Sequence, residues 1–122
     1  MMKKSKCVIL VVEDEAITLL DAEATIREAG FDVAVAANAD EAIRILESRD
    51  DVCLVFSDID MPRGSINGVG LAQLVGKRWP TVRVILTSGQ RHSDSAEGHR
   101  FFPKPYRGCD VALAVREMTV GM

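Results

Sequence analysis

Acidic residues follow two apolar segments of the chain, at the points where those segments end. Glu13 and Asp14 come directly after Val12, and Asp58 follows a second apolar run, with Asp60 two residues later. Carboxylates brought together repel one another by about 4 kcal/mol per pair at 4 Å and an effective dielectric constant near 20. We therefore expect such a cluster to hold a cation, and oxygen ligands that leave room for water and phosphate oxygens suit Mg²⁺. An aspartate placed there can also act as a nucleophile and form an aspartyl phosphate.

A hydroxyl group and a lysine follow two further apolar segments. Thr87 and Ser88 end one of them, and Lys104 follows the other. The Ser88 hydroxyl could donate to a phosphoryl oxygen, and the Lys104 ammonium could neutralise another. Capping of the next helix is an alternative explanation for any single strand-end acid, and Asp14 is the best candidate for it. The combination at four strand ends favours phosphoryl chemistry.

Alternating elements would position these residues. Continuous apolar, β-rich runs predict strands, and the segments between them have helical spacing. This alternation predicts an α/β protein with a parallel sheet covered by helices on both sides, of the flavodoxin-like doubly wound class, with five strands in the order 2-1-3-4-5. Ligands bind outside the carboxyl ends of such strands, so the four strand ends would meet at one edge. The expected strands are 6–12, 31–36, 51–57, 81–87 and 100–102, and the expected helices are 15–29, one starting near Asn38, 68–78 and 107–118.

Two segments have weaker patterns. Residues 90–99 are polar, so the helix between the fourth and fifth strands should be short, irregular or absent. The first helix ends at Gly30, and Asn38 with Glu41 forms a capping pair for the second. The helical spacing of the first helix rests on Ile17, Leu20, Ala24 and Ile26.

Length and composition exclude several classes of protein. The 122 residues leave room for one domain, 1–122, and 48% of them are hydrophobic. A net charge of −3 argues against direct nucleic-acid binding. The longest apolar run, 7–12, is far too short for a membrane span. Cys7 and Cys53 each lie in an apolar run, so we interpret them as core thiols of a cytoplasmic protein rather than as disulfide partners.

Four segments together resemble a known family. VVEDE (11–15), FSDIDMP (56–62), ILTSG (85–89) and FFPKPY (101–106) are similar to the signature segments of bacterial two-component receiver domains, such as the chemotaxis response regulator. The resemblance implies a stand-alone response regulator that takes a phosphoryl group from a sensor histidine kinase or a histidine phosphotransfer protein. It would then switch binding of a downstream protein target. Self-phosphorylation and autodephosphorylation with Mg²⁺ would be its only catalysis.

The resemblance also implies roles for residues of the acidic cluster. Asp58 matches the phosphoacceptor of the family. Asp14 would hold Mg²⁺ directly and Glu13 often through water, while the backbone carbonyl of Asp60 supplies another ligand.

Further positions match the switching residues of the family. Ser88, 30 residues after Asp58, matches the switch hydroxyl. Lys104 matches the phosphate-binding lysine, whose bond to Pro105 would be cis. Phe101 falls where the family has a switching aromatic, although a plain core phenylalanine fits equally well. Only 15 residues separate Ser88 from Lys104, fewer than usual, and we expect phosphorylation to order residues 89–100 with Phe101 moving inward.

Three other functions share parts of this pattern. A degenerate receiver used only for protein binding should lack the acceptor, the lysine or the acidic pair, and all are present. Asp58 and Asp60 match the DxD of haloacid-dehalogenase-type phosphatases, but that motif belongs on a first strand. A flavin carrier would not place Glu13, Asp14 and Glu15 where it must bind phosphate.

Overall fold

A five-stranded parallel sheet forms the centre of the protein. The computed structural model describes residues 7–62, 64–89 and 98–121. The strand order β2-β1-β3-β4-β5 confirms the predicted fold class and order. The strands are β1 (Val8–Val12), β2 (Asp32–Ala36), β3 (Val52–Asp58), β4 (Arg83–Ser88) and β5 (Arg100–Pro103). β4 therefore begins two residues later than expected and ends with Ser88.

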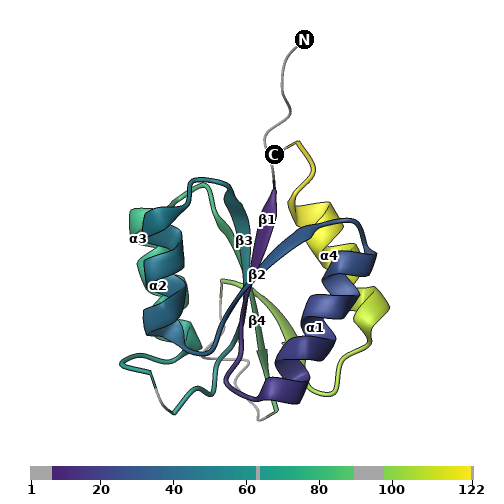
Figure 1. The fold of residues 1–122 in the computed structure, drawn as a ribbon, viewed down its shortest axis with the longest axis horizontal. Coiled ribbons are helices and arrows are strands. Elements are labelled where there is room, and N and C mark those ends of the chain that lie inside the picture. The colour runs from purple at the N-terminus through teal and green to yellow at the C-terminus, as the bar shows by residue number, and fades with distance from the viewer. Residues whose placement is uncertain (1–6, 63, 90–97, 122) are drawn as a thin grey trace.

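Helices cover both faces of this sheet. The described helices are α1 (Ala16–Glu28), α2 (Ala39–Ser48), α3 (Gly68–Arg78) and α4 (Gly108–Met118). Helices α1 and α4 lie on one face, and α2 and α3 lie on the other (Figure 1). The expectations that a helix between β4 and β5 is short, irregular or absent, and that phosphorylation orders 89–100, concern a segment that lies mostly outside the described residues. Within the described residues, no helix is long and apolar enough to cross a membrane.

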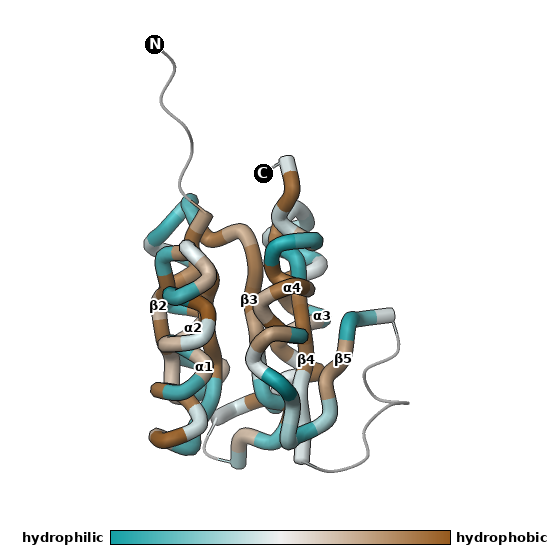
Figure 2. The backbone as a smooth tube through the Cα atoms, turned by 90° about the vertical axis from the view of Figure 1, so that its right-hand side faces the viewer, coloured by the Kyte–Doolittle hydropathy of each residue, from teal (hydrophilic) through white to brown (hydrophobic). Residues whose placement is uncertain are grey.

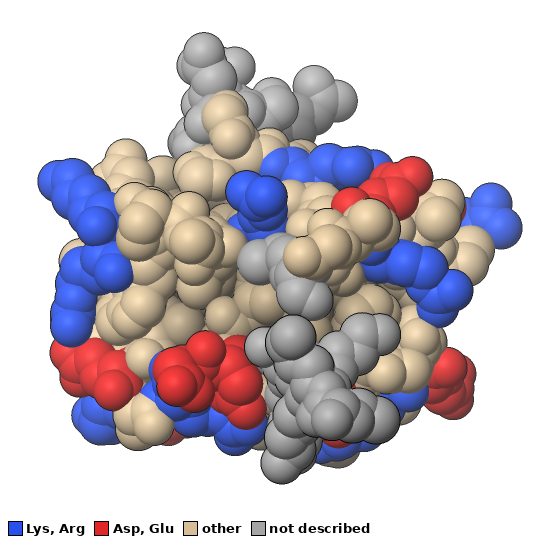
Figure 3. Space-filling model, turned by 90° about the horizontal axis from the view of Figure 1, so that it is seen from above, with Lys and Arg blue, Asp and Glu red and all other residues tan. Residues whose placement is uncertain are grey.

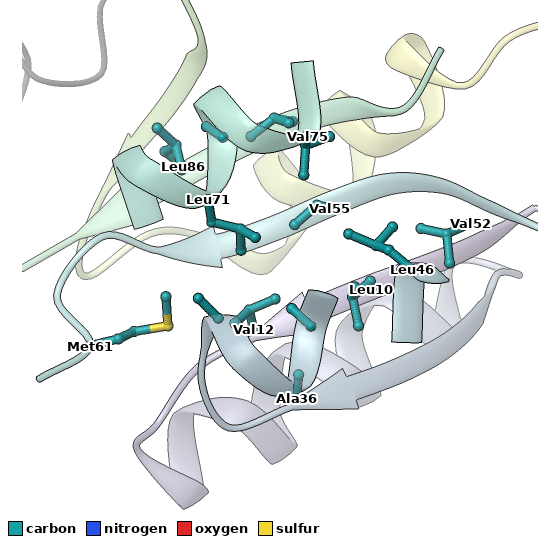
Figure 4. Packing of buried hydrophobic residues seen from close by; sticks show 14 of the residues in the cluster. Leu10, Val12, Ala36, Leu46, Val52, Val55, Met61, Leu71, Val75 and Leu86 are labelled. Carbon is teal, nitrogen blue, oxygen red and sulfur yellow. The ribbon is translucent and has the colours of Figure 1, made fainter. Parts of the chain in front are cut away.

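Burial on both faces explains the continuous apolar strands. Every residue of β1 and β3 is buried, and hydrophobic residues concentrate along β3 and β4 (Figure 2). Side chains alternate between the two faces, so each strand supplies two separate apolar clusters. Leu10 and Val55 meet Leu46 and Leu71 of the α2/α3 layer (Figure 4). The second cluster lies between the sheet and the α1/α4 layer.

Polar side chains fix where the first two helices begin. Glu15 caps α1 by accepting the Thr18 N–H at 2.8 Å, so the alternative explanation of Asp14 as the cap of this helix was wrong. Asn38 caps α2 by accepting the Glu41 N–H at 2.9 Å, which confirms the predicted pair. Because Glu15 satisfies the helix end, the Asp14 carboxylate is available for the sheet edge.

The four apolar residues whose spacing predicted α1 do not form one buried face. Ile17 and Leu20 are 76% and 63% exposed, and Ala24 is exposed as well. Ile26 is buried together with Ala22. At 3.6 residues per turn, the first three form one stripe, and Ile26 lies roughly 160° around the helix from it. Helical spacing therefore identified the helix correctly but did not tell which side of α1 faces the sheet.

A disulfide joins Cys7 to Cys53, so the expectation of two free core thiols was wrong. The two cysteines are 46 residues apart in sequence, but Cys7 directly precedes β1 and Cys53 lies in β3, its neighbour in the predicted and observed strand order. Val8 pairs with Val52 and Ile9 with Leu54, which leaves Cys53 as an extra residue next to the start of β1. The two Cα atoms are 5.4 Å apart, within the usual range for a disulfide.

We predict that this disulfide stabilises the fold. Reduction should lower the free energy of unfolding by about 2–4 kcal/mol, because the cross-link restricts the unfolded chain. Urea unfolding with and without reductant measures this difference. Replacement of the exposed Cys109 by Ser is the control and should change neither value. Three thiols reacting with a thiol reagent in the denatured, unreduced protein would contradict the prediction.

Candidate functional site

The register of the sheet brings four strand ends to one edge. Val12 of β1 pairs with Ser57, Asp58 pairs with Thr87, and Ser88 pairs with Pro103 of β5. The residues at or after these ends, Glu13, Asp58, Ser88 and Lys104, therefore share the carboxyl edge. At the opposite edge, Lys and Arg side chains lie around the rim with Asp and Glu among them rather than in one block (Figure 3).

Lys104 forms ion pairs with two buried carboxylates. Its Nζ lies 2.8 Å from Glu13 Oε1 and 3.3 Å from Asp58 Oδ2. Glu13 and Asp58 are only 4% and 5% exposed. The backbone N–H of Lys104 donates to the Ser88 carbonyl at 2.8 Å, which fixes the lysine to the end of β4. The Lys104–Pro105 bond is cis, as predicted.

The environment shifts the pKa of both ion-pair partners. Burial raises the pKa of Glu13, and the Asp58 charge adds to this, while the hydrogen bond from Lys104 opposes it. Burial lowers the pKa of Lys104, but its contacts with Glu13 and Asp58 outweigh burial and raise the pKa overall. Lys104 therefore stays protonated at neutral pH. One ammonium group faces two carboxylates, so the site still favours a further cation.

The acidic cluster fits a hard divalent cation. Carboxylate oxygens of Glu13, Asp14 and Asp58 all lie within 4.8 Å of one another, and Asp14 is the most exposed of the three. Glu13 is held in place because its Oε2 accepts the Glu15 N–H at 3.1 Å. An all-oxygen set of ligands suits Mg²⁺, which usually keeps several water molecules.

The two hydroxyl groups at the end of β4 point to different partners. Thr87 Oγ1 donates to the Phe102 carbonyl at 2.7 Å, toward β5. Ser88 Oγ donates to Asp60 Oδ2 at 2.5 Å, at the edge that carries the acidic cluster. Ser88 rather than Thr87 is thus placed to contact a group on Asp58. Phe101 is half-buried against the α2/α3 layer, and its switching role stays a prediction.

Sequence reasoning missed two features that position the site. It treated Asp60 as a backbone ligand, whereas its carboxylate accepts from Ser88 and its N–H donates to Asp58 Oδ1 at 3.2 Å. It also passed over Gly68, the first residue of α3. A Cβ at Gly68 would overlap the Asp58 carbonyl oxygen and lie 2.7 Å from the Ile59 Cα. A glycine directly after the helix cap Asn67 was the available signal, because glycine weakens a helix unless packing requires it.

Comparison with known families decides the class of protein. The family model of the response regulator receiver domain matches residues 9–103. The chain belongs to this family. Receiver domains act in phosphorelay signalling as switches rather than as classical enzymes. Curated relatives include putative NtrX-like response regulators of Rickettsia felis and Rickettsia conorii, each 30% identical over 125 residues and 89% of this receiver domain. The chain spans 26% of the length of those relatives.

Solved receiver domains have the same fold. The receiver domain of NtrX from Brucella abortus is 25% identical, with a TM-score of 0.86 over 93% of this chain and 99% of that one. A receiver domain protein from Clostridium thermocellum is 25% identical, with a TM-score of 0.84 over 92% and 93%. The response regulator TrrA from Thermotoga maritima, solved with Mg²⁺ and beryllium fluoride, is 26% identical, with a TM-score of 0.79 over 91% and 97%.

We predict that Gly68→Ala disturbs the end of β3, because the new methyl group must displace the backbone at Asp58. The substitution should lower the free energy of unfolding by about 1–3 kcal/mol, the usual cost of overpacking. Gly76→Ala is the matched control in the same helix, where a Cβ meets nothing within 4 Å. That control should gain about 0.5–1 kcal/mol. Urea unfolding of both variants measures the difference, and equal stabilisation by both would contradict the packing argument.

Proposed function

We propose that this receiver domain accepts a phosphoryl group on Asp58 and thereby changes the binding of a partner protein. The Asp58 carboxylate carries this proposal, because it is nearly buried at the sheet edge, paired with Lys104 and grouped with two further carboxylates. In the reaction, an Asp58 oxygen forms a bond to phosphorus. The bond from phosphorus to the donor's imidazole nitrogen breaks, and the imidazole leaves with that electron pair.

The residues around Asp58 then hold the transferred group. Lys104 would keep its ammonium near one phosphoryl oxygen, and Ser88 would donate its hydroxyl hydrogen to another. Glu13, Asp14 and Asp58 would hold Mg²⁺, with the Asp60 carbonyl as the further ligand that the family pattern implies. When bound, Mg²⁺ would neutralise negative charge on the donor and on the acceptor.

A protein donor fits the surface beside the site. Ile17 and Leu20 of α1 are exposed large hydrophobic residues, which is unusual for two neighbours on one helix turn. A hollow next to Lys104 is lined by Ile17, Asp21 and Tyr106 among others. An apolar helix face adjoining the acceptor favours docking of a protein that carries a phosphohistidine. We therefore propose a sensor histidine kinase or a histidine phosphotransfer protein as the donor.

We predict that Asp58 is the only phosphorylated residue. Acetyl phosphate with Mg²⁺ should add one phosphoryl mass to the wild type and none to Asp58→Asn, since the amide is not a nucleophile for this step. Intact-mass spectrometry measures both proteins. Asp110→Asn, an exposed change on α4, is the control and should label like the wild type. Equal labelling of the Asp58 variant would refute the assignment, and no labelling of the wild type would favour the degenerate receiver.

We predict that Mg²⁺ stabilises the folded protein by relieving repulsion among the carboxylates. At 100 times its dissociation constant, the free energy of unfolding should rise by about 2.7 kcal/mol. Asp14→Asn should lose most of this gain, whereas Asp110→Asn should keep it. Thermal unfolding with millimolar Mg²⁺ and with chelator provides the measurement. A wild-type melting temperature that ignores Mg²⁺ would overturn the metal site.

A further inference from the structure

The carboxylate of Asp60 has no role in the function proposed above, although it lies within the site. Its Oδ2 accepts the Ser88 hydroxyl at 2.5 Å, and its own backbone N–H donates to Asp58 Oδ1 at 3.2 Å. Asp60 therefore touches the acceptor through its backbone and the switch hydroxyl through its side chain. A hydroxyl-to-carboxylate distance this short is typical of a charge-assisted hydrogen bond, which is stronger than a bond between neutral groups.

The Ser88 hydroxyl has a single hydrogen to donate. In the structure that hydrogen goes to Asp60, whereas the proposed phosphoryl group on Asp58 requires it for one of its own oxygens. Both acceptors are anions, and Ser88 is fully buried, so water does not readily replace the lost bond. Formation of one hydrogen bond from Ser88 therefore requires the loss of the other.

We infer that Asp60 is a positioning residue that competes with the phosphoryl group for the Ser88 hydroxyl and so disfavours the phosphorylated conformation. This inference rests on the proposed function. A ligand shifts an equilibrium only by its differential interaction with two states. The Asp60–Ser88 bond is an interaction of the unphosphorylated state, and it reduces the net gain from contacts with the phosphoryl group.

Binding of beryllofluoride with Mg²⁺, a mimic of the phosphoryl group, tests the inference at equilibrium. Calorimetric titration would compare the wild type with Asp60→Ala, Asp60→Asn, Ser88→Ala and the double variant Asp60→Ala/Ser88→Ala. Asp60→Ala should bind beryllofluoride about tenfold more tightly than the wild type. A factor of that size in the dissociation constant corresponds to the loss of one charge-assisted hydrogen bond. The affinity of Asp60→Asn for beryllofluoride should lie between those of the wild type and Asp60→Ala, because its amide oxygen still accepts from Ser88 but carries no charge.

The Ser88→Ala background separates positioning from simple repulsion. If Asp60 acts through the hydroxyl, Asp60→Ala should change the affinity much less in that background than in the wild type. Equal tightening in both backgrounds would mean that the Asp60 charge repels the mimic directly, and it would overturn the inference. Binding by Asp60→Ala no tighter than by the wild type would also overturn it while leaving the proposed function intact. Failure of the wild type to bind the mimic would instead refute the proposed function and the inference together.

Discussion

The rest of the site depends on the ion pairs between the Lys104 ammonium and the two buried carboxylates of Glu13 and Asp58. Glu13 comes from the end of β1, Asp58 from β3 and Lys104 from the segment after β5, so one contact joins elements far apart in sequence. Removal of the lysine would leave two buried anions unpaired, and breaking a buried pair in this way generally costs about 3–5 kcal/mol. By bringing Lys104 to Glu13 and Asp58, the strand order and register therefore also offset the cost of burying these two carboxylates. Because the ammonium matches only one of the two negative charges, the site keeps a surplus of negative charge that favours a further cation.

The geometry of the site constrains the residues at the starts of two neighbouring helices. α3 must approach the end of β3 so closely that only a glycine fits at position 68. Glu15 rather than Asp14 caps α1, which leaves Asp14 for the acidic cluster. These arrangements place functional groups where a purely structural protein would place caps and apolar contacts. A fold that holds such groups rigidly can respond sharply when a new charge arrives, because packed elements shift between discrete arrangements.

The sequence predicted which residues lie at the carboxyl edge of the sheet, but few of the contacts between those residues. Polar residues after continuous apolar runs indicate strand ends, so Asp58, Ser88 and Lys104 could be placed without coordinates. The Cys7–Cys53 pair could not be found this way, although the predicted strand order already makes β1 and β3 neighbours, because the pairing depends on the irregular register that leaves Cys53 beside the start of β1. The same limit hid the bond between Asp60 and Ser88, because it depends on the register of β3 against β4 and on one rotamer.

The apolar pattern of α1 does not indicate which of its faces is buried. Ile17 and Leu20 have the spacing of a core stripe, yet the face that packs on the sheet is formed by Ala22 and Ile26. Ile17 instead lines the hollow beside Lys104 and Tyr106, and Leu20 is exposed one turn along the same helix. Local sequence rules tend to fail where a protein must do something besides fold. Here the failure lies on the surface that borders Lys104, where the proposed phosphoryl donor would have apolar area to bury.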